Sequence, residues 1–213
     1  MKFRSIAIIA IVLIFISTWK KTKAEILLDS LPKGWRKTMT TTPDVIFGID
    51  EKIKHSGKAS GFIKLEGGSG PQAFGTMLQS IIAEGYRGQR ITMSVYAKSD
   101  AVMRAGFYLR VDGPETILTF ANTFKKPIEE TTDWKQYQIT LDVPEKAKNI
   151  DFGAMLMQEG TLWMDDYKIA VVDKTVLSDD FVPNYTTEQK SRKLPIRKNQ
   201  PNPRPINLDF EAL

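Results

Sequence analysis

Apolar and polar residues alternate over much of the chain between residues 25 and 182. In "RITMSVYAKS" (90–99) every second side chain is apolar, and in "MRAGFYLRVDG" (103–113) the apolar positions again alternate with polar or small ones. The polar side of the second stretch carries Tyr108 and Arg110. A period of two predicts β-strands that bury one face.

Further short stretches have the same character: "ASGFIKLEG" (59–67), "FGTMLQSIIA" (74–83), "QYQITLDV" (136–143), "IDFGAMLMQ" (150–158) and "TLWMDDYKIAVV" (161–172). Turn residues separate them, and the body contains no amphipathic helix of useful length. A parallel sheet needs crossover helices, so that class is excluded. The pattern predicts an all-β, antiparallel sandwich or barrel.

The last of these stretches contains two adjacent aspartates, Asp165 and Asp166. Leu162 and Met164 are apolar at even positions, whereas Tyr167 begins an apolar series at odd positions. An extra residue in the ladder, a β-bulge, produces such a switch of phase. A structural calcium ion bound by these carboxylates, or another functional polar site, is an open alternative. Neighbouring strand residues point to opposite faces, so the pair does not form a glycosidase acid–base pair by itself.

The two ends of the chain differ from this body. Residues 1–24 place Lys2 and Arg4 before an apolar run, which predicts export through a signal peptide or an uncleaved membrane anchor. Residues 25–182 form the predicted sandwich. Residues 183–206 are basic and proline-rich and predict an extended linker. Residues 207–213, "NLDFEAL", are either the opening strand of a second module or a tail that packs back on the sandwich.

Charge and composition narrow the function. Residues 1–24 contain five basic and no acidic residues, which equals the formal net charge of +5 of the whole chain. The body has no basic patch of the kind that binds nucleic acid, and we expect no nucleic-acid partner. The chain has no cysteine and one histidine, which excludes thiol nucleophiles and multi-histidine zinc sites. No nucleophile–base pair is evident, so we expect no enzyme.

Several motifs together resemble the jelly-roll carbohydrate-binding modules, the galactose-binding-like β-sandwich domains of secreted bacterial proteins. The resemblance covers roughly residues 26–172 and rests on "LPKGW", "HSGKASGFIKL", "GYRGQRITMSVYAKS", "TTDWKQY" and "LWMDD". It implies a jelly-roll sandwich that binds a carbohydrate or a cell-envelope glycan. The opening strand lacks the asparagine and glutamate that are usual in these modules, which weakens the transfer of the family's calcium site.

Sugars are held by aromatic faces and by polar groups that satisfy their hydroxyls. The predicted ligand-binding residues are Gln79, Tyr96, Tyr108, Arg110 and Gln158. The sequence therefore predicts an exported, periplasmic, secreted or membrane-anchored binding module, with no certain cofactor and a possible structural calcium at Asp165 and Asp166. Its membrane contact would be limited to the N-terminal segment. The alternative is a structural domain that docks on a partner protein and has no sugar ligand.

Overall fold

The computed structural model describes residues 31–40, 45–66, 70–179 and 200–212, and within them the protein is all-β. The only helical element among these residues is the short 3₁₀ turn η1 (Glu84–Tyr86). No helix in the described part has the length and apolar character to cross a membrane. The predicted leader at residues 1–24 lies outside the described residues. The strands are β1 (Arg36–Met39), β2 (Val45–Asp50), β3 (Ser60–Leu65), β4 (Phe74–Ile82), β5 (Arg90–Asp112), β6 (Ile117–Asn122), β7 (Ile128–Asp142), β8 (Asn149–Met157) and β9 (Gly160–Val172).

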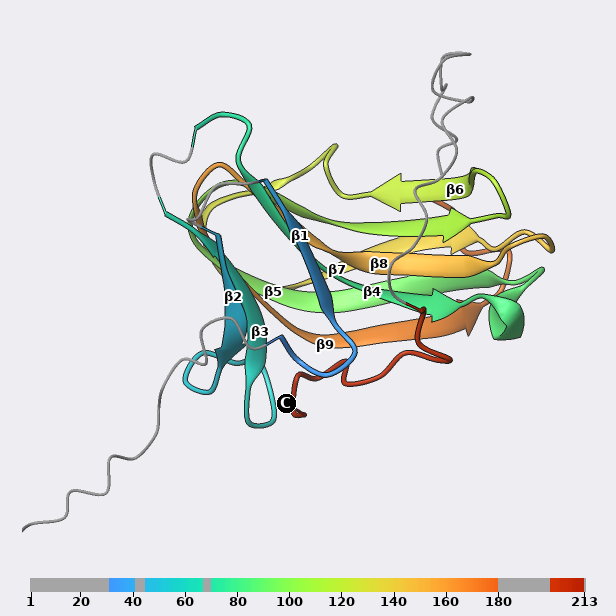
Figure 1. Cartoon of the computed structure of the whole chain (residues 1–213), viewed down its shortest axis with the longest axis horizontal. Coiled ribbons are helices and arrows are strands. Elements are labelled where there is room, and N and C mark those ends of the chain that lie inside the picture. Colours follow the sequence, from blue (N-terminus) through green and yellow to red (C-terminus); the bar gives the residue numbers. More distant parts are fainter. Residues whose placement is uncertain (1–30, 41–44, 67–69, 180–199, 213) are drawn as a thin grey trace, which may run out of the picture.

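Strand β5 is 23 residues long and belongs to both layers of the fold (Figure 1). Its first half, as far as Asp100, pairs with β9, and its second half, from Arg104, pairs with β8 and β6. Strand β7 pairs with the first half and, irregularly, as far as Ala105. Layer 1 is therefore ordered β2-β3-β9-β5-β7, and layer 2 is ordered β1-β4-β8-β5-β6. All of these strand pairs are antiparallel. The predicted antiparallel all-β class is confirmed.

The chain passes from one layer to the other at Ala101, which has a φ of 49°. Positive φ is unfavourable for a residue with a Cβ atom and marks a sharp change of direction. Gly160 lies against this crossover, and a Cβ atom there would overlap Val102. The turn between β8 and β9 thus needs a glycine where it meets β5.

The core lies between the two layers and follows the alternation of the sequence. In both halves of β5 the odd-numbered apolar residues are buried: Ile91, Met93, Val95, Ala97, Ala105, Phe107, Leu109 and Val111. They pack in one cluster with the inward side chains of the other strands. An aromatic group closes part of this core, in which Trp35 stacks on Phe210 at a centroid distance of 4.8 Å and lies 5.1 Å from Tyr167.

Phe210 belongs to residues 200–212, which we call the C-terminal segment. In Figure 1 this segment, coloured red, runs from the β4 side of the sandwich towards β2 and β3. Asn202 forms a parallel bridge with Ile81 at the edge of β4. The segment therefore packs back on the sandwich, which is one of the two alternatives for the end of the chain. Asn202 lies within the predicted linker at residues 183–206, of which residues 183–199 lie outside the described residues.

Candidate functional site

A charged group lies on the outer face of layer 2. Arg110 points away from the core, because its neighbours Leu109 and Val111 in β5 are buried inside it. Its guanidinium Nη2 lies 2.7 Å from Asp151 Oδ2 in β8, and its Nε lies 3.0 Å from Asp112 Oδ1. Both carboxylates are buried, whereas the arginine side chain is 30% exposed. The two aspartates hold the guanidinium in one orientation and leave part of it accessible.

Tyr108 is half-buried on the same face and lies two residues before Arg110 in β5. Burial and the nearby Asp151 raise the pKa of the Tyr108 phenol far above its usual range, so the hydroxyl stays protonated at physiological pH. Burial alone would lower the pKa of Arg110, but Asp112 and Asp151 outweigh it and raise that pKa. The face therefore presents a neutral phenol beside a permanent cation.

Tyr108 lies in a row of paired residues on this face, of which Leu78 and Gly153 are buried. The strand register places Arg36, Leu78, Gly153, Tyr108 and Asn122 in one row across the five strands of layer 2. Gly153 fits closely against β4, where a Cβ atom would overlap the backbone of Met77 and Leu78. The glycine lets β8 and β4 approach each other closely beside Tyr108.

A second polar feature of the same face is the hydroxyl of Thr76. Thr76 pairs with Thr38 of β1 and Met155 of β8, two residues along β4 from the row that contains Tyr108. It is 3% exposed, and its Oγ1 has no hydrogen-bond partner among the residues that the structure describes. An unsatisfied buried hydroxyl is uncommon in native proteins and favours a bound water or a ligand group nearby.

The other three predicted ligand-binding residues lie elsewhere. Gln79 points into the interior because it shares its side of β4 with Met77 and Ile81, and it is fully buried. Its amide bonds to the C-terminal segment: Nε2 donates to Ile206 O at 2.5 Å, and Oε1 accepts from Ile206 N at 3.2 Å. The structure does not bring Gln79 to the face that carries Tyr108.

Tyr96 and Gln158 are also separate from that face. Tyr96 is in the first half of β5, and its neighbours Val95 and Ala97 point into the core, so it lies on the outer face of layer 1. Its ring stacks on the His55 ring, with 3.7 Å between the ring centroids. Gln158 is in the turn after β8 with a φ of 71°, and its N–H donates to Ala73 O. Along β8 it is five residues beyond Gly153, or about 16 Å at the usual rise of a strand. Only Tyr108 and Arg110 of the predicted set lie together.

Two residues of the charged group, Asp112 and Asp151, were not predicted from the sequence. A signal for Asp151 was present, because it lies between the apolar Ile150 and Phe152 and so shares the outward side of its strand. Alternation gives the face of a residue but not its partner. The partner comes from the pairing of Asp151 with Arg110, residues 41 positions apart in sequence.

The bulge at the two adjacent aspartates is confirmed. The register between β5 and β9 shifts between Ser94 and Tyr96, which face Lys168 and Asp165, so β9 contains one extra residue there. Asp166 has a φ of 51°. Met164 before the bulge and Tyr167 after it are both buried, as the switch of phase predicts.

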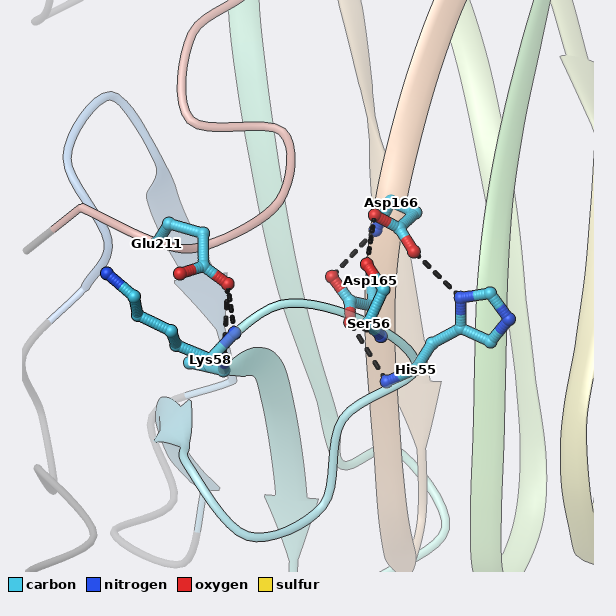
Figure 2. A network of polar contacts seen from close by, with 7 residues as sticks. His55, Ser56, Lys58, Asp165, Asp166 and Glu211 are labelled. Carbon is cyan, nitrogen blue, oxygen red and sulfur yellow. Dashed lines mark hydrogen bonds and ion pairs between the residues drawn. The ribbon is translucent and has the colours of Figure 1, made fainter.

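The bulge carries a polar network that holds the loop before β3 (Figure 2). Asp165 Oδ2 accepts from the backbone N–H of His55 at 2.9 Å and of Ser56 at 3.1 Å, and Oδ1 accepts from the N–H of Asp166. Asp166 Oδ2 lies 2.7 Å from Nδ1 of the His55 ring, and Asp166 Oδ1 accepts from the Ser56 hydroxyl at 2.9 Å. Burial raises the pKa of Asp165 to about 6, although the backbone donors lower it.

This geometry uses the aspartates as hydrogen-bond acceptors. Both oxygens of Asp165 already receive N–H groups, and the described residues contain no cluster of three acidic or histidine side chains arranged for a metal ion. The calcium site therefore stays a prediction. The Ser56 hydroxyl donates to Asp166 and not to His55, so these three residues do not form a nucleophile–base pair.

Known proteins resemble this chain in sequence or in fold. No family model matches the chain. An uncharacterised helix-turn-helix-type transcriptional regulator, YbfP, of Bacillus subtilis (strain 168) is 33% identical over 199 residues, which cover 92% of this chain and 63% of that protein. This chain thus spans less than two thirds of the length of that relative.

Solved structures show similarity in fold alone. The enzymatically active domain of tailspike protein 4 of bacteriophage CBA120 has a TM-score of 0.54, 12% identity and coverage of 66% of this chain and 20% of that chain. A Stig cyclase from Fischerella sp. TAU has a TM-score of 0.50, 14% identity and coverage of 72% and 92%.

Carbohydrate-binding modules also occur among the structural neighbours. A family 61 module in complex with β-1,4-galactotriose has a TM-score of 0.46, 11% identity and coverage of 66% of this chain and 90% of that chain. A similarity of this size carries no argument about a ligand.

Proposed function

We propose that this chain is a non-catalytic binding module whose ligand, a carbohydrate or cell-envelope glycan, binds the outer face of layer 2. The observation that carries the proposal is the group formed by Tyr108, Arg110, Asp112 and Asp151. It places a half-buried aromatic ring next to a guanidinium that two buried carboxylates hold in place.

The chemistry of this group suits a polyhydroxylated ring. The apolar face of a sugar packs on an aromatic ring, while its hydroxyls need donors and acceptors of fixed geometry. Arg110 supplies N–H donors in a rigid fork, and Tyr108 supplies a neutral hydroxyl that both donates and accepts. The ion pairs with Asp112 and Asp151 lower the entropy cost of ordering the arginine when a ligand binds.

Thr76 supports the same face. Its unsatisfied hydroxyl lies in layer 2, two residues along β4 from the row of Tyr108. The face therefore combines an aromatic surface with polar groups on three neighbouring strands, β4, β8 and β5, and these are features of a shallow ligand site on a sheet.

The test is glycan-array screening of the full chain, followed by calorimetric titration with and without calcium. We expect saturable binding to at least one glycan and a loss of at least tenfold in affinity in Tyr108→Ala, because the stacking surface is removed. Tyr96→Ala is the matched control, since Tyr96 lies on the other layer, and we expect its affinity to stay within twofold of the unchanged protein.

Two results would contradict the proposal. One is an equal loss of affinity in both variants while each keeps its thermal unfolding transition, which would move the site away from Tyr108. The other is no binding to any glycan together with capture of an envelope protein by the full chain. That second result supports the alternative of a structural or protein-docking domain.

A second candidate function follows from the YbfP relative. The region shared with that regulator covers 92% of this chain, and a helix-turn-helix needs two helices, whereas the described residues form strands. On this candidate the chain corresponds to a part of such a regulator that does not contact DNA, and the layer 2 face binds a small polar effector. Titration with free monosaccharides, in place of polymers, separates this candidate from glycan binding.

Export is part of the first proposal. The charged and apolar leader at residues 1–24 supports it, by either a cleaved signal peptide or an uncleaved anchor. N-terminal sequencing of the mature protein, recovered from cell fractions, distinguishes cleavage from anchoring.

A further inference from the structure

The C-terminal segment contacts the sandwich in the way a bound peptide contacts its receptor. Residues 200–212 dock through a few anchors and through backbone hydrogen bonds to β4, to β9 and to Lys33, which precedes β1. Asn202 N–H donates to Ser80 O at 2.7 Å, and Ile82 N–H donates back to Asn202 O at 2.9 Å. Further along, Tyr167 N–H donates to Leu208 O at 2.9 Å. Added-strand pairing of this kind gives affinity to extended peptides.

The main anchor is the aromatic side chain of Phe210, which is 1% exposed. It stacks on Trp35, and the indole Nε1 of Trp35 donates to Asn207 O at 2.9 Å. Gly61 of β3 makes room for the ring, because a Cβ atom at that position would overlap Phe210. A pocket with a glycine wall and a stacking tryptophan selects an aromatic residue at this position.

The buried amide of Gln79 forms hydrogen bonds to the backbone of the segment. Gln79 is 0% exposed, and its amide is satisfied by Ile206 N–H, Ile206 O and the side chain of Asn202. Without the segment this amide would lose those hydrogen bonds, and a buried unsatisfied amide is costly. The sandwich therefore contains a polar group whose described partners all come from residues 200–212.

The segment also provides a carboxylate. Glu211 Oε1 accepts the backbone N–H groups of Lys58 and Ala59, as Figure 2 shows beside the aspartate network. A Cβ atom at Gly57 would overlap this carboxylate. The loop before β3 is thus held by Asp165 and Asp166 on one side and by Glu211 on the other. Acidic capture of free N–H groups adds charge specificity to the aromatic anchor.

We infer that Trp35, Gln79, Gly61 and the loop 57–59 form a peptide-binding cradle. The cradle recognises a peptide that turns between Asn207 and Phe210 and carries the pattern Asn202, Ile206-Asn207 and Phe210-Glu211. The segment of the same chain occupies the cradle in this structure. Two of its residues, Asn207 and Phe210, adopt positive φ values of 49° and 57°, a conformation that free peptides rarely hold at a phenylalanine. This inference is independent of the proposed glycan site, which lies on the outer face of layer 2.

The test uses the full chain with a site-specific protease sequence in place of residues 188–193. Folded protein is cut, so that the segment stays bound without its covalent tether. Cutting matters because a tethered segment competes with added peptide at an effective concentration near the millimolar range. A fluorescein-labelled peptide of residues 200–213 is then added, and exchange is followed by the anisotropy of the label.

We expect the labelled peptide to replace the cut segment and to be displaced by unlabelled peptide. A Phe210→Ala peptide should bind roughly thirtyfold more weakly or worse, because the stacked anchor is lost. An Arg204→Ala peptide is the matched control, since Arg204 is exposed, and it should bind within twofold of the unchanged peptide.

A second arm uses the uncut chain with Phe210→Ala. Its own segment lacks the anchor, so added unchanged peptide should bind this variant and not the unchanged chain. Three results would overturn the inference: equal binding of the Phe210→Ala and Arg204→Ala peptides, no exchange in a cut protein that stays folded, or unfolding of the sandwich on cutting. The last would mean that residues 200–212 are an inseparable part of the core.

Discussion

At the scale of single residues, charge burial and hydrogen bonding oppose each other at Asp165. The carboxylate is 1% exposed, and burial raises its pKa despite three backbone N–H donors. The same donors fix the loop that carries His55. Asp165 therefore orders a loop at the expense of an unfavourable buried charge.

This balance predicts how stability depends on pH. The pKa of Asp165 is about 6 in the fold, whereas an aspartate in an unfolded chain has a pKa of 3.8, so the native state binds the proton more tightly than the unfolded state. The free energy of unfolding should then rise as pH falls from 7.5 to 5, by about 1 kcal/mol from this group. Aspartates with lowered pKa values, such as Asp142, lose their contribution only at lower pH.

Chemical denaturation at several pH values checks this prediction. His55 and Asp166 face the same network, so the comparison is with Asp165→Asn, which lacks the titrating group and keeps the neighbours. We expect the difference in unfolding free energy between the two proteins to change with pH. Parallel pH profiles would show that Asp165 does not titrate in this range.

The sequence pattern predicted the structural environment of some residues and not of others. The switch of phase at Asp165 predicted the bulge correctly, because a local shift in parity has a local cause. Alternation also placed Gln79 beside Met77 and Ile81, which marks it as inward, yet it was predicted as a ligand residue on polarity alone. Its partner Ile206 lies 127 positions away, and no local pattern encodes that pairing.

At the scale of elements, the crossover in β5 was not predicted as part of one continuous strand. The two alternating stretches, 90–99 and 103–113, were each correct, and the residues between them include no glycine. Ala101 takes a positive φ there because Asp100 still pairs in layer 1 and Arg104 already pairs in layer 2. The strands β1, β2 and β6 were also missed, since they are short or lack clean alternation.

The crossover gives a prediction for stability. Ala101→Gly removes the Cβ atom from a left-handed position and should raise the free energy of unfolding by about 0.5–1 kcal/mol. Ala97→Gly is the matched control in the same strand. Ala97 is buried, so its loss of a methyl group should lower stability by about 1 kcal/mol or more.

Thermal and urea unfolding of both variants provide the measurement. A destabilised Ala101→Gly protein would show that the alanine side chain makes contacts that outweigh its backbone strain.

At the scale of the whole molecule, charge is divided unevenly. The five basic residues of the first 24 equal the net charge of the chain, and residues 186–206 contain six basic residues and one acidic residue. The sandwich between them has no basic excess. Its faces therefore give little general attraction to a polyanion.

This division predicts weak contact with DNA, although the YbfP relative is named as a transcriptional regulator. In a mobility-shift assay with the full chain, we expect no sequence-selective complex. Any retention at about 50 mM salt should disappear near 200 mM, because it would come only from the basic ends. A complex that survives the higher salt and prefers one sequence would contradict this prediction.

The shared β5 has a consequence for how the protein opens. In two independent sheets, one could fray while the other kept its amide protons protected from solvent exchange. Here the single strand β5 contributes hydrogen bonds to both sheets, so opening at its midpoint loosens both the half that carries Tyr96 and the half that carries Tyr108. We therefore expect the amide protons of the two sheets to become exposed to exchange together.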